Sequence, residues 1–78
     1  MQYNAPNVPP MSARALLAHN LRRMRADRGW SQEDLAAACG LDRSFVAHVE
    51  RAARNISIDN IERLAIAFGV KIADLFSI

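Results

Sequence analysis

The stretch QEDLAAACGLDRSFVAHV, residues 32–49, has a pattern that suits two short helices joined by one tight turn. Gly40 supplies a residue that can adopt a positive φ in this turn, and Leu41 can fill the corner. The apolar residues that would face one another across the turn are Leu35, Ala36, Cys39, Val46 and Val49. We therefore interpret the stretch as a helix-turn-helix, while an ordinary αα-hairpin remains the alternative.

Starts and ends of further helices are marked along the rest of the chain. Four times an apolar residue precedes a capping residue, with a second apolar residue four positions after the cap, as in a hydrophobic staple. The instances are Met11-Ser12-Leu16, Trp30-Ser31-Leu35, Leu41-Asp42-Val46 and Ile56-Ser57-Ile61, and Val70-Lys71-Leu75 repeats the spacing without a good cap. Each of the three glycines follows a helical pattern that a left-handed residue would close. The sequence therefore predicts an all-α fold, a compact five-helix domain with helices at about 12–28, 32–39, 43–52, 58–68 and 71–76.

Composition indicates one small globular domain. The 78 residues are long enough for a single modest core, and 51% of them are hydrophobic against 23% charged. Residues 1–11 hold all three prolines and no charged side chain, so they are expected to form a flexible arm before a domain at 12–78. Because the arm has no Lys or Arg, it is poorly suited to a DNA minor groove.

Several classes of protein are disfavoured by the same composition. One cysteine excludes an internal disulfide, and with no signal peptide a cytoplasmic location is expected. The longest apolar run, LAIAFGV at 64–70, is too short to span a bilayer, so no membrane partner is expected. Cys39 and the two histidines cannot make a zinc set, so we expect no metal and no other cofactor. With neither a Gly-rich phosphate loop nor a Ser-His-Asp arrangement, the chain is not expected to be an enzyme, and core packing is favoured for Cys39 over a nucleophilic role.

The second helix of a helix-turn-helix can enter the DNA major groove with its N-terminus first. Since Val46 and Val49 point inward, the helical period turns four other residues outward as candidates for reading bases: Arg43, Ser44, Ala47 and His48. Arg43 can bond guanine at O6 and N7 with both prongs of its guanidinium, and Ala47 can offer a methyl contact to thymine. Two alternatives remain open, an Arg43 that binds phosphate and a His48 that lies on the surface without a DNA role.

Contacts to the DNA backbone are expected on both sides of the reading helix. Gln32 stands in the first turn of the preceding helix, where free backbone N–H groups suit a phosphate. Phe45 can pack against sugar or a thymine methyl, or simply rest on the neighbouring helix. Arg51, Arg54 and Asn55 follow the reading helix and can hold the backbone there. Arginine, which makes up nine of the ten basic residues, suits such contacts because its planar fork grips phosphate.

Residues 21–76 resemble the phage-repressor and Cro-like helix-turn-helix domain, the XRE family. The motifs that carry the resemblance are R-x-x-R-G-W-S-Q-E-D-L-A, the G-L-D-R-S turn, V-x-x-V-E-R, R-N-I-S and a closing D-L-F. The R-N-I-S-x-x-N-I-E stretch and the short length are similar to stand-alone members, including controller proteins of restriction-modification systems. The resemblance implies a phosphate contact for Gln32 and a partly buried ion pair between Arg25 and Glu50 that braces the reading helix. Two independent surface charges are the alternative for that pair.

These observations lead us to expect a sequence-specific DNA-binding transcriptional regulator, a repressor or autoregulator, that binds a palindromic operator as a homodimer through the major groove. One module offers few base-reading side chains, and a palindrome read by two modules doubles them. Dimer contacts are expected from the C-terminal face, at Ile72, Phe76 and Ile78. No small-molecule ligand is expected, because no ligand-sensing domain follows Ile78. An antitoxin-like adaptor that keeps the fold and binds proteins is the alternative, and the presence of Arg43, Gln32 and Arg51 argues against it.

Overall fold

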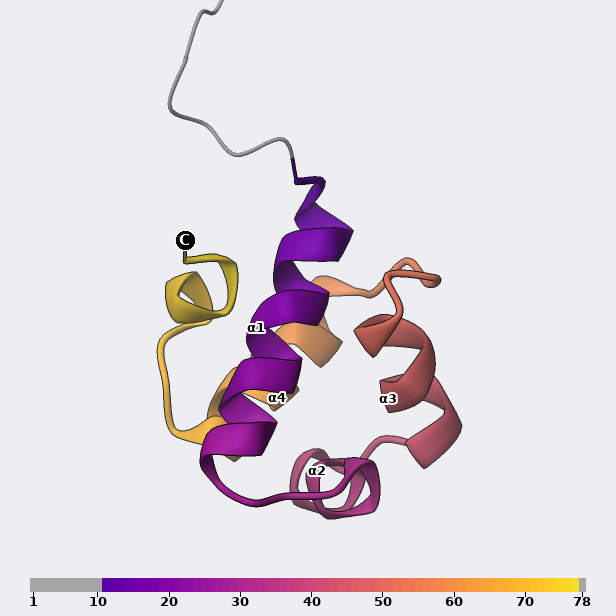
Figure 1. The fold of residues 1–78 in the computed structure, drawn as a ribbon, viewed down its shortest axis with the longest axis vertical. Coiled ribbons are helices and arrows are strands. Elements are labelled where there is room, and N and C mark those ends of the chain that lie inside the picture. Colours follow the sequence, from indigo (N-terminus) through magenta and orange to yellow (C-terminus); the bar gives the residue numbers. More distant parts are fainter. Residues whose placement is uncertain (1–10, 78) are drawn as a thin grey trace, which may run out of the picture.

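The computed structural model describes residues 11–77, which form four α-helices and one 3-10 helix. The elements are α1 (Ala13–Asp27), α2 (Gln32–Cys39), α3 (Arg43–Glu50), α4 (Ile58–Phe68) and η1 (Ile72–Phe76). In Figure 1, α2 lies below α1, while α3 and η1 lie on opposite sides of it and α4 lies behind. Within the expected N-terminal arm, residues 1–10 are outside the described part, as is Ile78.

The N-termini of the helices are fixed by the capping residues that the sequence marks. Ser12, Ser31 and Ser57 each accept a hydrogen bond on the hydroxyl from the backbone N–H three residues later, at 3.0–3.1 Å. The backbone N–H of Ser31 in turn donates to Asp34 Oδ2 at 2.8 Å, which completes a capping box at the start of α2. Asp42 precedes α3 but makes no such side-chain bond, so that helix starts without a cap of this kind.

The end of α3 differs from the prediction. The helix stops at Glu50, two residues before the expected end at 52, and Ala52 adopts a left-handed conformation with φ of 57°. Gly40, which closes α2, has φ of 73°, as the sequence suggested for a glycine after a helix. An alanine in this region is strained, because its Cβ approaches the following carbonyl. Without a glycine as marker, the end of α3 was not readable from the sequence.

The predicted fifth helix is present as the short 3-10 helix η1. Only five residues long, it starts after Lys71, whose N–H donates to Asp74 Oδ2 at 3.0 Å. Buried Asn20 on α1 secures its far end, because its Nδ2 donates to the carbonyls of Leu75 and Ser77, each at 2.9 Å. The sequence analysis did not identify Asn20. The predicted five-helix domain is therefore confirmed, with four α-helices and a 3-10 helix as the fifth element.

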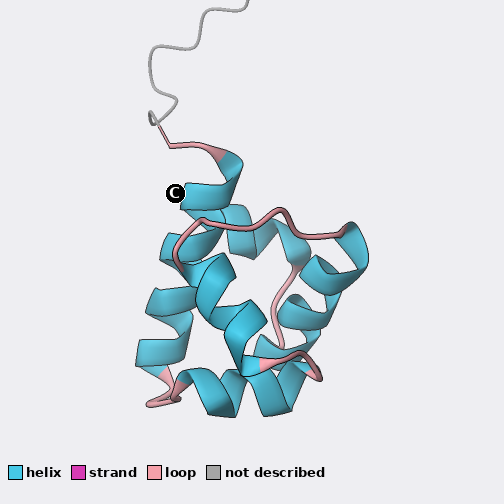
Figure 2. Ribbon diagram, turned by 90° about the vertical axis from the view of Figure 1, so that its right-hand side faces the viewer, coloured by secondary structure: helices cyan, strands magenta, loops and turns pink. Residues whose placement is uncertain are grey.

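One apolar core joins all five elements. The buried apolar faces of α1 and α4 close over the helix-turn-helix, and no strand occurs between residues 11 and 77 (Figure 2). Ile61 of α4 is half-buried at the core's edge. The buried apolar side chains in this cluster are Leu17, Leu21, Met24, Leu35, Ala36, Cys39, Val46, Val49, Leu64, Ala65, Phe68 and Leu75. In the described part of the chain, every helix is too short or too polar to cross a membrane.

Candidate nucleic-acid interface

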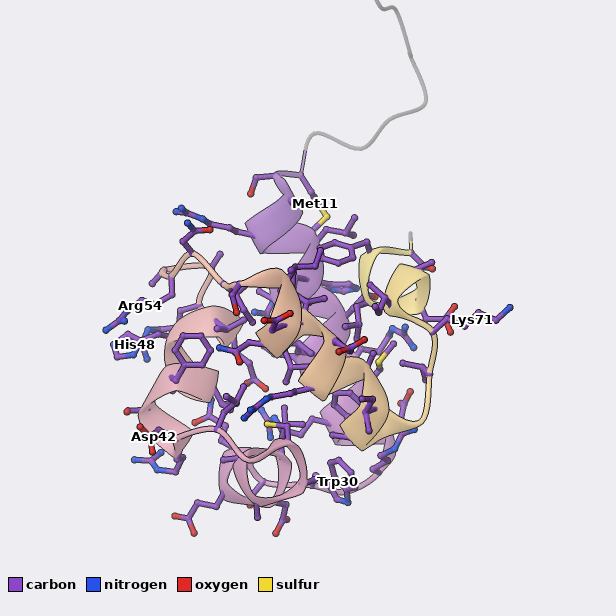
Figure 3. All side chains as sticks on the ribbon, turned by 180° about the vertical axis from the view of Figure 1, so that it is seen from behind. Met11, Trp30, Asp42, His48, Arg54 and Lys71 are labelled. Atoms are coloured by element: carbon purple, nitrogen blue, oxygen red, sulfur yellow. The ribbon has the colours of Figure 1, made fainter. Side chains whose placement is uncertain are left out.

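Helix α3 lies at an edge of the molecule and exposes its N-terminal half. It is anchored from inside by Val46, Val49 and Glu50, all of which are buried. Arg43 and Ser44 are exposed, as expected for residues that contact bases, while Ala47 and His48 are half-buried. In Figure 3, Asp42, His48 and Arg54 follow one edge of the molecule, and Lys71 lies at the opposite edge. The edge with α3 is therefore open to a large partner.

His48 is less free than the other outward residues of α3. Its Nδ1 is buried, and within residues 11–77 no group forms a hydrogen bond to it. Because one ring nitrogen is enclosed, only Nε2 is left to contact a base. His48 can therefore donate or accept at most one hydrogen bond with a base edge in the DNA major groove.

A hydrogen-bonded ion pair holds the C-terminal end of α3 to α1. Arg25 donates from Nε to Glu50 Oε2 at 2.8 Å and from Nη2 to Oε1 at 3.0 Å. Glu50 is only 3% exposed, and the Arg25 side chain is 23% exposed. Hydrogen bonding to Glu50 raises the pKa of Arg25, although burial opposes the rise. The structure thus brings the two residues together in the two-pronged geometry that gives Arg–carboxylate pairs their strength.

Three further contacts fasten this junction. Arg25 Nη1 donates to the carbonyl of Trp30 at 2.9 Å, which ties the same guanidinium to the loop before α2. Arg22 donates to the carbonyl of Glu50. Gln32 Nε2 donates to Glu50 Oε1 at 3.1 Å, so α2 joins the network as well. Gln32 was expected to contact phosphate, and its amide nitrogen is bonded here to the end of the reading helix.

A shallow hollow lies where the N-termini of α2 and α3 meet. It is lined by Arg25, Ser31, Gln32, Glu33 and Arg43. Glu33 and Arg43 face each other there, with 3.9 Å between Glu33 Oε1 and Arg43 Nε, and their side chains are 81% and 57% exposed. Glu33 was not among the expected site residues. Its position beside Gln32 in the first turn of α2 was the available signal.

The other expected backbone contacts fall into two groups. Arg51, Arg54 and Asn55 are exposed on the segment that follows α3. Figure 3 shows Arg54 on the same edge of the molecule as His48 of the reading helix. Phe45 is half-buried against the core, which matches the alternative in which it rests on neighbouring helices. Only part of its ring remains available to a sugar or a thymine methyl.

The apolar surface differs from the expectation for the C-terminal face. Ile72 is 40% exposed, but Phe76 is half-buried against the core, and Ile78 lies outside the described residues. The most exposed large apolar side chains are Ile58 and Ile66 of α4, at 73% and 72%. Neither isoleucine was among the residues expected at an interface. Exposure of Phe76 was therefore overestimated and that of α4 overlooked.

No site for a metal is evident in the described part. Between residues 11 and 77, no three His, Cys, Asp or Glu side chains gather closely enough to hold an ion. Cys39 is buried, and desolvation raises the pKa of its thiol.

Comparison with known families and sequences places this arrangement among gene regulators. A family model described as helix-turn-helix matches residues 21–75. A hypothetical transcription factor from Neisseria meningitidis is 56% identical over 57 residues, which cover 73% of this chain and 54% of that protein. The chain therefore matches about half the length of this relative. Control protein C.BamHI from Bacillus amyloliquefaciens is 41% identical over 63 residues, covering 80% of this chain and 78% of the control protein.

Solved structures agree with the sequence comparison. A hypothetical transcription factor from Neisseria superposes with a TM-score of 0.83 at 45% identity, covering 97% of this chain and 90% of that one. The restriction-modification controller protein C.Esp1396I, solved as a tetramer in complex with its natural 35 base-pair operator, superposes with a TM-score of 0.76 at 27% identity. That match covers 85% of this chain and 87% of the controller.

Proposed function

The chain belongs to this helix-turn-helix family, of the XRE type, and on that premise we propose that it is a sequence-specific transcriptional regulator. It binds a palindromic operator as a homodimer through the major groove and acts as a repressor or autoregulator in the cytoplasm. The likeness to controller proteins of restriction-modification systems supports a controller-like role. Family membership also agrees with the expectation that the chain is not an enzyme.

The proposal rests on how α3 is packed and hydrogen-bonded within the domain. The inward-facing side chains of α3 are buried, and the carboxylate of Glu50 at its C-terminal end accepts hydrogen bonds from α1 and α2. Arg43 and Ser44 at its N-terminus are exposed. A helix held rigidly on one side, with an arginine at its free end, can place that arginine against a guanine edge without ordering the helix first. Arg43 is the leading base-reading residue, with Ser44, Ala47 and His48 beside it.

Electrostatic contacts to the DNA backbone complete the interface. The exposed Arg51 and Arg54 follow the reading helix, and Asn55 adds an amide next to them. Gln32 contributes through its place in the first turn of α2. A dimer that neutralises about 6–10 phosphates would show a slope of about −5 to −9 when log affinity is plotted against log salt concentration.

An apolar groove at the far end of α3 supports a dimer. It is lined by the first residues of α1, by Asn55 and Ile56 after the reading helix, and by Phe76 of η1. A second copy seated on this groove lies next to Asn55, in the segment after the reading helix, so the C-terminal ends of the two reading helices approach the two-fold axis. For such a dimer we expect half-sites about one helical turn apart, roughly 34 Å, as is general for helix-turn-helix dimers. Phe76 and Ile72 then contribute to the interface.

Selection of binding sites from random duplex DNA tests the proposal. We expect an enriched palindrome with half-sites separated by about one helical turn. Sedimentation of the chain with the selected duplex should give two chains per site. If the selection enriches no sequence, or if a single chain occupies the enriched site, the proposal is wrong in its sequence specificity or in its symmetry.

A second candidate function rests on the two exposed isoleucines of α4. Ile58 and Ile66 are the most exposed large apolar residues described, and an adaptor that binds a protein partner would use such a face. Ile66→Ser separates the candidates. The adaptor reading requires the change to abolish partner capture, whereas the DNA-binding reading requires the selected duplex to bind as before.

A further inference from the structure

Glu33 lies on the face of the molecule that the proposed function assigns to DNA. Its carboxylate is 3.9 Å from Nε of Arg43, the residue with the leading claim to read a base. It stands second in α2, directly after Gln32. The capping box of Ser31 and Asp34 fixes this turn, so the backbone that carries Glu33 is held in place. An acidic side chain at this position needs an explanation, because phosphates repel it.

The geometry of the contact leaves the reading end of Arg43 free. A guanidinium carries five N–H donors, and a carboxylate at Nε occupies the side of the group nearest the aliphatic stem. The two terminal nitrogens keep donors that match O6 and N7 of guanine. Glu33 can thus hold the stem of Arg43 while the fork faces a base.

We propose that Glu33 is a specificity-determining residue that orients Arg43 toward guanine and disfavours its use as a phosphate contact. The inference rests on the proposed function and assigns a role within the same site. When Arg43 reads guanine, it stays next to Glu33 and neutralises that carboxylate. When Arg43 swings away to a phosphate, Glu33 is left uncompensated beside the polyanion. The acid therefore penalises the non-cognate complex more than the cognate one.

The pair gains strength only in the complex. With side chains 81% and 57% exposed, it is screened by water in the free protein and contributes little to folding. Closure of DNA over the hollow removes much of that water and strengthens the attraction between the two charges. The role of Glu33 accordingly appears in the ratio of cognate to non-cognate binding rather than in stability.

Glu33→Gln tests this role, because it keeps the size of the side chain and removes its charge. Affinity is measured by fluorescence anisotropy for the selected palindrome and for variants with one symmetric base pair changed. Glu62→Gln is the matched control, since Glu62 is exposed on α4, outside the proposed interface. Thermal melts of both variants verify that they are folded.

A bidentate arginine contact distinguishes its guanine from other bases by about 5- to 150-fold. In Glu33→Gln we expect that ratio to fall by about five-fold or more at the pair read by Arg43, mainly through tighter non-cognate binding. The ratio should stay unchanged in Glu62→Gln. In an Arg43→Ala background, Glu33→Gln should produce no further loss of discrimination at that pair.

Three results overturn the inference, the last of them together with the proposed function. An unchanged ratio at the Arg43 position in Glu33→Gln contradicts it while leaving the proposed function intact. An equal loss of the cognate-to-non-cognate ratio at every base position, in Glu33→Gln and Glu62→Gln alike, would mean that Glu33 acts only through the overall charge of the protein. If the wild-type chain discriminates among no sequences, the proposed function fails, and the role of Glu33 fails with it.

Discussion

Replacing Glu50 with alanine should destabilise the domain severely. The carboxylate is 3% exposed and accepts two hydrogen bonds from Arg25 and one from Gln32, so its loss leaves a partly buried guanidinium without its partner. Removal of one member of a buried pair costs about 3–5 kcal/mol. Because the Arg25 side chain is 23% exposed and water can partly replace the carboxylate, the lower end of about 3 kcal/mol is expected.

The size of the domain makes this loss easy to measure. For a domain of 60–100 residues, each kcal/mol lowers the unfolding midpoint by about 4–8 °C, so Glu50→Ala should lose about 12–24 °C. Urea titrations of the wild type, both single variants and the double variant with Arg25→Ala give the coupling free energy, expected at about 2 kcal/mol. Glu50→Gln keeps the volume and separates lost charge from lost packing. Coupling below about 0.5 kcal/mol would mean that the two residues act independently, and the brace would not hold α3 in place.

Three further variants test other parts of the structure. Ala52→Gly should raise the free energy of unfolding by about 0.5–1 kcal/mol, because a φ of 57° costs alanine about 1–2 kcal/mol and glycine much less. The neighbouring Ala53 does not have a positive φ, so Ala53→Gly should lower the free energy of unfolding. Equal losses of stability in both variants would refute the argument. Asn20→Ala should cost about 2–3 kcal/mol and speed carboxypeptidase trimming, because two carbonyls of the C-terminal segment lose their donor; trimming at the wild-type rate would contradict the role of Asn20. Burial raises the pKa of Cys39, so the thiol contributes its full stabilisation below the pKa of the unfolded state, about 8.5, and this contribution is lost as pH rises through the raised pKa. The free energy of unfolding should therefore fall more steeply above about pH 9 in the wild type than in Cys39→Ala. Identical pH profiles of the two proteins would count against burial as the cause.

Much of the fold was predictable because its signals are local. Serine caps, staples and glycines mark helix ends through contacts within four residues, and the bounds of α2 and α4 agree with the sequence reading. The end of α3 was missed because a left-handed alanine leaves no mark in the sequence. The hydrogen bonds by which Asn20 holds the end of η1 were not predictable, because Asn20 and Leu75 are 55 residues apart and no periodicity links them.

The candidate site was predictable where family resemblance or helical period supplied the pairing. The period separated the outward Arg43 from the inward Val46, and the V-x-x-V-E-R motif linked Glu50 to Arg25. Contacts between helices were harder, because they depend on how α2 and α3 cross. That crossing places Gln32 against Glu50 and Glu33 against Arg43, neither of which follows from spacing along one helix.

Repeating the selection from random duplex DNA with Arg43→Ala shows whether α3 reads operator sequence through Arg43. We expect a palindrome with the same half-site spacing and with preference lost at one symmetric pair of positions, at a cost of about 1–3 kcal/mol per half-site. Arg51→Ala, which removes an expected phosphate contact, should weaken binding to all sequences alike and leave the selected palindrome unchanged. An Arg43→Ala palindrome identical at every position to that of the wild type would contradict the claim.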